Sequence, residues 1–412
     1  MAIRITKQAE TYLGALAKEL EIPPSRYEQA EKSYKSLGEW FHREDSSVRD
    51  FDPDVFSQGS FKLGTVIKPQ SKDEEYDVDC GCSLTYLDKT KLSQANLKKL
   101  LGEEVKLYRK NKGITKEVHE GRRCWRLDYA DGAQFHMDLV PCIPNGHDQR
   151  QILEAKHLDA HFADTAIAIT DNEVLPQYLQ ITDDWPRSNP RGYADWFKSR
   201  MGDVFVQRRA QVLNEMQAKG ITASVEDIPT YRVRTPLQSA IMILKRHRDV
   251  MFENDPTNKP ISIILTTLAA HAYQGESTIG YTLISILNRM EDAIEHDGQK
   301  FVIKNPTDAL ENFADKWDEH PERAQAFYSW LEQARKNFID VGVLVEHQRM
   351  SSILENRIGH RLTEQISNSI FQSTGSGTSS LLSAATVASA TSVPSVSFSD
   401  EPRNPKKPDG FA

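Results

Sequence analysis

Residues 58–65 read Gln-Gly-Ser-Phe-Lys-Leu-Gly-Thr, and residues 75–81 read Glu-Tyr-Asp-Val-Asp-Cys-Gly. The first stretch holds a Gly-Ser turn whose backbone amides could receive phosphate groups. In the second stretch Asp77 and Asp79 are two positions apart, so in a β-strand both side chains lie on one face. Adjacent carboxylates repel each other unless a cation lies between them, and Mg²⁺ favours carboxylate oxygens together with substrate phosphates. The two stretches therefore predict a metal-dependent enzyme that acts on nucleotides.

The composition is that of a globular chain large enough for two lobes, with 412 residues of which 39% are hydrophobic and 27% charged. The formal net charge is −8, so any contact with nucleic acid would need a local basic patch. Residues 106–112 form a basic segment, but charge runs are usually solvated faces, and we expect no nucleic-acid activator. No run approaches the roughly 18 apolar residues of a membrane span. The N-terminus lacks the apolar stretch of a signal peptide, so we expect a cytoplasmic protein without membrane contact.

Four cysteines are too few for a disulfide framework. Cys80 and Cys82 lie on one face of the predicted strand, pointing toward an apolar core, and we interpret them as reduced packing residues. A Cys-x-Cys metal site is the alternative interpretation.

The first third of the chain has an α+β pattern. Helices are expected at about 8–20, 25–43 and 91–101, and strands at about 75–86, 122–129 and 134–141. Asp131-Gly132 between the last two strands is a hairpin signal. In the last strand His136 and Asp138 face away from the apolar side, so Asp138 is a third carboxylate presented on a polar face.

The second half of the chain is predicted to be almost entirely helical. Thr235 has the residue type of an N-cap and Pro236 that of a first helical turn. Helices are expected at about 193–218, from 235, near 260–262, and at about 277–296, 307–315, 321–337 and 347–371. We divide the chain into N-terminal helices with a long spine helix (1–48), a catalytic lobe (49–200), a helical lobe (201–372) and a Ser/Ala-rich disordered tail (373–412).

Three carboxylates on adjacent strands can hold two metal ions, which stabilise the entering and leaving oxygens of an in-line displacement. Asp77 and Asp79 would bridge both ions, and Asp138 would bind the ion beneath the attacking hydroxyl and help to accept its proton. Taken singly, each residue has another interpretation. The Asp pair could be a solvated strand face, Asp138 a salt-bridge partner of Arg123 or Arg126, and Ser60 a helix cap.

The order Gly-Ser, Gly-Thr, Asp-x-Asp and a single later Asp resembles the DNA polymerase β nucleotidyltransferase superfamily. Within it, residues 59–65, 76–81, 135–141 and 235–248 are similar to the bacterial cGAS/DncV-like nucleotidyltransferases (CD-NTases). The resemblance covers about 25–370. It implies a polymerase β-like lobe with a mixed sheet, a helical C-terminal lobe, and an active site in the cleft between them.

The resemblance also implies roles for individual residues. In such enzymes a lysine on the helix after the catalytic lobe and a serine at the next helix start grip the triphosphate, and Lys245 and Ser262 match these positions. An exposed helix lysine is the alternative for Lys245, and His247 is expected to be a packed or surface residue. The nucleotide-binding turn comprises Gly59, Ser60, Gly64 and Thr65. Two Mg²⁺ ions, for which Mn²⁺ can substitute, are implied at Asp77, Asp79 and Asp138.

The implied reaction is attack by a 3′- or 2′-hydroxyl on the α-phosphate of a nucleoside triphosphate, with release of pyrophosphate. A linear intermediate would then close into a cyclic di- or trinucleotide messenger of bacterial antiphage (CBASS) defence. ATP and GTP are the expected substrates and cyclic GMP-AMP the leading product. Two rivals remain open: a linear oligonucleotide synthase or RNA-tailing enzyme, and a non-catalytic nucleotide-binding scaffold.

The chain ends Asp409-Gly410-Phe411-Ala412 behind the predicted flexible linker. Some members of the family are conjugated through such a C-terminus by a ubiquitin-ligase-like partner, which is the further partner that the resemblance suggests. A solubilising tail is the alternative.

Overall fold

The computed structural model describes residues 4–70, 76–129, 135–218, 220, 224, 228, 232–296 and 298–375. By their internal contacts residues 1–370 form one compact unit and residues 371–412 a second. The predicted tail from 373 lies outside the described residues apart from the last turn of a helix that ends at Gly375. The predicted Asp131-Gly132 turn lies outside them too.

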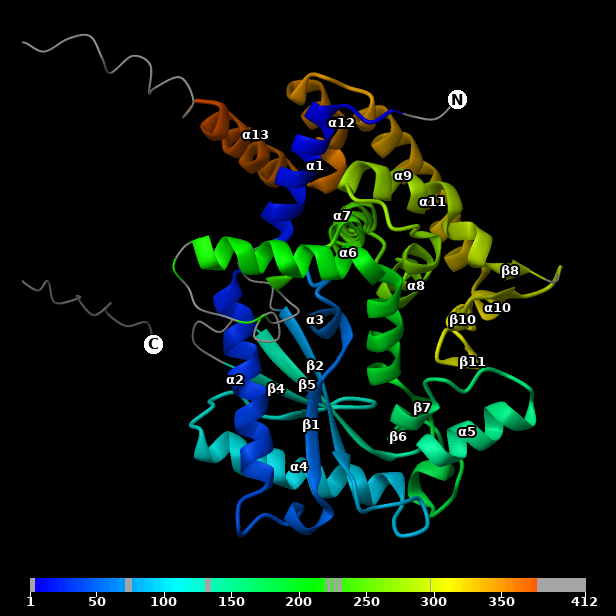
Figure 1. Cartoon of the computed structure of the whole chain (residues 1–412). Helices are drawn as coiled ribbons and strands as arrows, with labels where there is room; N and C mark the ends of the chain where they lie inside the picture. The colour runs from blue at the N-terminus through cyan, green and yellow to red at the C-terminus, as the bar shows by residue number, and fades with distance from the viewer. Residues whose placement is uncertain are drawn as a thin grey trace, which may run out of the picture. The chain divides into compact units, whose positions relative to one another are not determined.

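A mixed sheet forms the centre of the N-terminal part of the first unit (Figure 1). Its seven strands are β1 (Pro53–Ser57), β2 (Tyr76–Leu84), β3 (His119–Glu120), β4 (Trp125–Tyr129), β5 (Phe135–Pro144), β6 (Ile167–Ile169) and β7 (Arg187–Ser188). The order is β1-β2-β5-β4-β3, with β6 paired to β5 and β7 to β6. β2 and β5 run parallel, and the other pairs of this sheet run antiparallel. The predicted α+β class with a mixed sheet is therefore confirmed.

One face of β2 and β5 is apolar and is buried beneath helices. Val78, Met137 and Leu139 lie in a core to which α2 (Pro24–Phe41) and α4 (Gln94–Asn111) also contribute. Burial of this face is the hydrophobic driving force that fixes the pleat, so the alternate residues must face the opposite way. Cys80 and Cys82 are fully buried in the same core, which confirms their packing role.

The remaining helices are α1 (Lys7–Leu20), α3 (Gly59–Leu63), α5 (Gly146–Ala155), α6 (Pro190–Ala218), α7 (Pro236–Met251), α8 (Ser262–Ala272), α9 (Ile279–Arg289), α10 (Lys316–Glu319), α11 (Pro321–Gly342), α12 (His347–Ile358) and α13 (His360–Gly375). Most of them surround a second core, whereas α3 contributes Phe61 to the first core and α5 contributes Leu153 to a small separate cluster. Short 3₁₀ turns cover Arg49–Phe51, Ala163–Thr165, Gln177–Leu179 and Met290–Ala293. The second core draws its buried residues from α1 and from α6–α13. None of the helices within the described ranges combines the length and the apolar character needed to cross a membrane.

α7 passes through this second core and is buried over most of its length. It begins as predicted at Thr235 and Pro236, and Thr235 forms a capping box with Gln238. A helix that is buried on every side must bring its polar side chains to partners, since an unpaired buried charge is costly. The side chains of the Lys-Arg-His-Arg run at 245–248 are buried, so their positions are determined by contacts within the protein.

Several predicted helices have different bounds or a different structure, among them the helix predicted at about 91–101, which runs from Gln94 to Asn111. The helix predicted over 307–315 is wrong, because β10 (Lys304–Asn305) and β11 (Asp308–Asn312) form a hairpin there. The side chains of Asn305 and Asn312 bond backbone groups at Thr307, Phe301 and Ile303, and such local bonds compete with a helix. The helix predicted to 296 ends at Arg289, and a second hairpin follows, β8 (Glu295–His296) with β9 (Phe301–Val302). Gly359, with a φ of 98°, divides the helix predicted over 347–371 into α12 and α13.

Candidate active site

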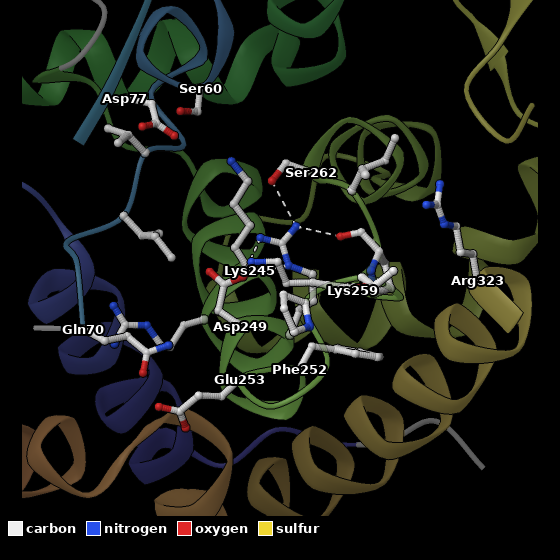
Figure 2. A pocket seen from close by; sticks show the side chains of 18 of the residues that line it. Ser60, Gln70, Asp77, Lys245, Asp249, Phe252, Glu253, Lys259, Ser262 and Arg323 are labelled. Atoms are coloured by element: carbon white, nitrogen blue, oxygen red, sulfur yellow. Dashed lines mark hydrogen bonds and ion pairs between the residues drawn. The ribbon is translucent and has the colours of Figure 1, made fainter. Parts of the chain in front are cut away.

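A cavity of about 990 Å³ lies between the sheet and the helices α7 and α8 (Figure 2). Its lining includes four of the predicted site residues: Ser60 and Asp77 from the sheet side, and Lys245 and Ser262 from the helical side. Figure 2 shows the Lys245 side chain extending toward Asp77 and Ser60. The predicted cleft between a sheet-bearing and a helical part is therefore present, and its size suits a small-molecule ligand.

The three predicted carboxylates lie on one face of adjacent strands. In the parallel register Asp79 is opposite Asp138, and Asp77 is opposite His136. Burial, together with the negative charges of Asp77 and Asp138, raises the pKa of Asp79 to about 6. Burial also raises the pKa of Asp138, whose Oδ1 is buried without a hydrogen-bond partner.

These residues fit a divalent cation. A cation would offset the burial and the carboxylate repulsion that together raise the pKa of Asp79, and it would give the buried Oδ1 of Asp138 its missing partner. Within the described ranges no three His, Cys, Asp or Glu side chains are arranged as a complete metal site. Neither Arg123 nor Arg126 pairs with Asp138, because Arg123 bonds Asp171 and Arg126 bonds Asp128. The salt-bridge interpretation of Asp138 is therefore not supported.

Asp77 has a partner that the sequence prediction did not include. Its Oδ1 lies 2.6 Å from Nε2 of His136, and this hydrogen bond holds the pKa of Asp77 below its usual range. On its other side His136 places Nδ1 2.8 Å from Nη2 of Arg126. The available signal was the strand alternation, which puts His136 on the same face as Asp138.

The Gly-Ser turn packs directly against Asp79. Gly59 begins α3 with a φ of 62°, and a Cβ at this position would lie 2.1 Å from Oδ2 of Asp79. The backbone N–H of Gln58 donates to the carbonyl of Asp79 at 2.8 Å. Gln58, and not Ser60, is the N-cap residue, so the helix-cap interpretation of Ser60 is wrong. Only glycine fits between this turn and the carboxylate.

Lys245 is a buried lysine that lines the cavity, and not an exposed helix residue. Its Nζ donates to the carbonyl oxygen of Thr65 at 3.1 Å and to its Oγ1 at 3.2 Å. Burial, with a smaller effect of the Arg248 charge, lowers the pKa of Lys245 to about 7. Two further bonds fasten the same segment to the helical part: Gln238 donates to the Leu63 carbonyl and Arg234 to the Gly64 carbonyl. Gly64 and Thr65 therefore join the turn to α7.

Ser262 is the first residue of α8, as predicted, and its hydroxyl accepts a hydrogen bond from Nη1 of Arg248 at 3.0 Å. Arg248 also donates to the Pro260 carbonyl and to Oδ1 of Asp249. The sequence prediction did not include Arg248 among the site residues. Its position three residues after Lys245 places both side chains on one face of the helix, and this spacing was the available signal.

His247 is fully buried and hydrogen-bonded to Asn337 at 3.1 Å, which confirms the prediction that it is a packed residue. Burial lowers its pKa to about 4. The basic segment 106–112 lies on α4, where Lys106 pairs with Glu103 and Arg109 with Glu117, as on an ordinary solvated face.

Comparisons with known proteins bear on both the sheet and the whole chain. Residues 53–142 match the family model described as "Cyclic GMP-AMP synthase DncV-like, nucleotidyltransferase domain". A c-di-GMP synthase from Roseivirga ehrenbergii is 27% identical over 377 residues, 90% of each chain. The cyclic dinucleotide synthase CdnG from Bradyrhizobium diazoefficiens is 24% identical over 322 residues, which cover 75% of this chain and 70% of that one. The solved structure of that CdnG in complex with GTP superposes with a TM-score of 0.66 at 20% identity, over 88% of this chain and 99% of the other. The fold is therefore shared with that structure.

We predict that Gly59→Ala lowers activity by about 100-fold or more, because a displaced carboxylate at the reacting centre costs about that much. The added Cβ would push Asp79 out of place. The matched control is Gly113→Ala, since Gly113 has a similar φ of 66° but open space around it. Pyrophosphate release from nucleoside triphosphates measures the effect, with thermal melting as the check on folding. Equal activity in the two variants would contradict this placement of Asp79.

We also predict that kcat/KM for the nucleoside triphosphate falls as the pH rises above 7. Lys245 attracts a triphosphate only when protonated, and its pKa in the free protein is about 7, so the charged fraction is lost above that pH. The expected slope approaches tenfold per pH unit, as for any single essential acid. Lys245→Arg keeps its charge at every pH, so the alkaline fall should be absent in that variant. An alkaline fall of the same size in Lys245→Arg would assign the titration to another group.

Proposed function

We propose that the chain is a nucleotidyltransferase of the bacterial cGAS/DncV-like (CD-NTase) family and that it makes a cyclic dinucleotide from nucleoside triphosphates, as its similarity to that family's domain model and to two cyclic dinucleotide synthases supports. The observation that carries this proposal is the parallel register of β2 and β5. It places Asp79 opposite Asp138, with Asp77 on the same strand face, beside a cavity that Ser60 and Lys245 also line.

Asp77, Asp79 and Asp138 would hold Mg²⁺ or Mn²⁺, which supplies charge neutralisation at the α-phosphate and activation of the attacking hydroxyl. Asp138 would bind the ion beneath the attacking hydroxyl and help to accept its proton. Nζ of Lys245 offsets the charge of the triphosphate. The hydroxyl of Ser262, held by Arg248, and the backbone amides at Gly59 and Ser60 would orient the phosphates.

Two turnovers at this one site account for a cyclic product. In the first, a hydroxyl of one nucleotide attacks the α-phosphate of another, and pyrophosphate leaves. In the second, a hydroxyl of the linear product attacks its remaining α-phosphate, and a second pyrophosphate leaves. Both steps form one phosphodiester bond and break one phosphoanhydride bond, so the same three carboxylates serve both.

The identity of the cyclic product has two candidates. The sequence resemblance favours cyclic GMP-AMP, whereas the relative from Roseivirga ehrenbergii, which matches 90% of the chain, is a c-di-GMP synthase. We therefore propose a guanine-containing product and place cyclic di-GMP first. A role in antiphage (CBASS) defence and conjugation of the C-terminus by a ubiquitin-ligase-like partner remain proposals that rest on the sequence resemblance alone.

The test is incubation with Mg²⁺ or Mn²⁺ and either GTP alone, ATP alone or both, followed by phosphatase treatment and mass spectrometry. We expect GTP alone to give a phosphatase-resistant product with the mass of cyclic di-GMP. A cyclic product that forms only when both GTP and ATP are present would identify cyclic GMP-AMP as the product instead. A ladder of linear products would support the oligonucleotide synthase instead, and no product at all would support the scaffold.

We predict that Asp77→Asn combined with Asp79→Asn reduces product formation to background while the protein stays folded. Both side chains lie on the polar strand face, and removing two repelling charges leaves the apolar core intact. The matched control is Asp50→Asn combined with Asp52→Asn. It makes the same charge change at the same spacing on exposed residues of a surface turn. Retained activity in the first double variant would overturn the metal assignment.

A further inference from the structure

Six polar side chains form two rows across the strands β4, β5 and β2. In the first row Asp128 is opposite His136, which is opposite Asp77. In the second row Arg126 is opposite Asp138, which is opposite Asp79. Within each strand the two residues are two positions apart, so all six lie on the face that carries the proposed metal ligands.

Arg126 connects the two rows through two hydrogen bonds, one along its own strand to Asp128 and one diagonal to His136 on β5. Arg126 is opposite Asp138 across the strands, yet its Nε donates to Oδ1 of Asp128 at 3.0 Å and its Nη2 contacts Nδ1 of His136 at 2.8 Å. A guanidinium group can only donate, so Nδ1 of His136 must be the acceptor and the ring proton lies on Nε2. Nε2 then donates to Oδ1 of Asp77 at 2.6 Å. These contacts form a hydrogen-bond chain that runs from Asp128 through Arg126 and His136 to Asp77.

This hydrogen-bond chain has two consequences for the carboxylates of Asp77 and Asp138. First, one oxygen of Asp77 is bonded to a histidine that is only 5% exposed, which fixes the rotation of the carboxylate and leaves Oδ2 for a cation. Second, Arg126 donates its hydrogen bonds to Asp128 and His136, and Oδ1 of Asp138 remains buried without a hydrogen-bond partner. Both effects preserve ligand capacity for a metal ion.

We infer that His136 is a positioning residue for the metal site, oriented by Arg126 and Asp128, and that it holds Asp77 in the rotation that binds a divalent cation. This inference rests on the proposed function, because it assumes that Asp77 is a metal ligand. Hydrogen bonds to ligating carboxylates tune metal sites in this way, and their removal typically weakens metal binding by about 10- to 100-fold. A purely structural role for His136 would affect stability but not the affinity for the cation.

The test is direct binding of Mn²⁺ to the full chain without nucleotide, measured from the electron paramagnetic resonance signal of free Mn²⁺. The informative pair is His136→Gln and His136→Asn. The amide nitrogen of Gln can take the place of Nε2 and donate to Asp77, whereas the shorter Asn places its amide near the former Nδ1. We expect His136→Asn to weaken Mn²⁺ binding at least about tenfold and His136→Gln to keep most of the affinity.

Arg126→Lys provides a second variant if substitution at His136 prevents folding, because the Arg126 side chain is partly exposed and lysine keeps the positive charge that acts on Asp77 and Asp138. It should also weaken Mn²⁺ binding, since lysine lacks the planar fork that bonds Asp128 and His136 together and so orients the His136 ring. His119→Ala is the control. His119 is an exposed histidine on the same sheet, opposite Arg126 in the register, and the protein with this substitution should bind Mn²⁺ as the unaltered protein does.

Unchanged Mn²⁺ affinity in a folded His136→Asn or Arg126→Lys variant would overturn the inference. Asp77→Asn separates this outcome from failure of the proposed function. If Asp77→Asn abolishes Mn²⁺ binding while His136→Asn does not, the metal site stands and the positioning role falls. If Asp77→Asn binds Mn²⁺ normally, the metal assignment itself falls.

Discussion

The repulsion among three carboxylates on the shared face of β2 and β5 is the constraint on which the rest of the site depends. The parallel register sets their spacing, and the apolar residues on the opposite face hold that register by their burial. Burial raises the pKa of Asp79 and of Asp138, and the charges of neighbouring carboxylates raise both further, so the ionised carboxylates are unfavourable at these two positions. Perturbed carboxylates of this kind are typical of functional sites, and a cation bound between them would offset the cost.

Several independent elements maintain this arrangement. The Gly59 turn abuts Asp79 so closely that no side chain fits between them, and His136 fixes Asp77 from the other side. Across the cavity, α7 supplies Lys245 from inside a packed helical core, where a lysine would normally be costly. The bonds from Lys245 to Thr65 offset part of that cost and at the same time connect the helical part to the Gly-Ser turn. The contacts that stabilise the lysine thus also set its position relative to the carboxylates.

Local patterns in the sequence predicted the features that depend on local physics. Strand alternation predicted the shared face of Asp77 and Asp79, and cap chemistry predicted the start of α7 at Thr235. The helix predicted over 307–315 is a hairpin at 304–312 instead, because the side chains of Asn305 and Asn312 bond nearby backbone groups and so compete with helix formation. Apolar spacing alone does not reveal these bonds. His136 and Arg126 were missed as site residues for a different reason. Their roles depend on the register between strands that are distant in sequence or run in opposite directions, and a single sequence does not specify that register.

The two most perturbed groups of the site, Asp79 and Lys245, have opposite charges but a common cause for their shifts. Burial disfavours the charged form of each, so the pKa of Asp79 rises to about 6 and that of Lys245 falls to about 7. A cation at the carboxylates favours the ionised aspartate, and a triphosphate beside α7 favours the protonated lysine. Metal and nucleotide would therefore each restore a charge that burial opposes, the metal at Asp79 on the strand face that Asp77 extends to the cavity, and the nucleotide at Lys245 on the cavity wall. Because the two ligands also attract each other, the site is best suited to the metal–nucleotide complex and less to either ligand alone.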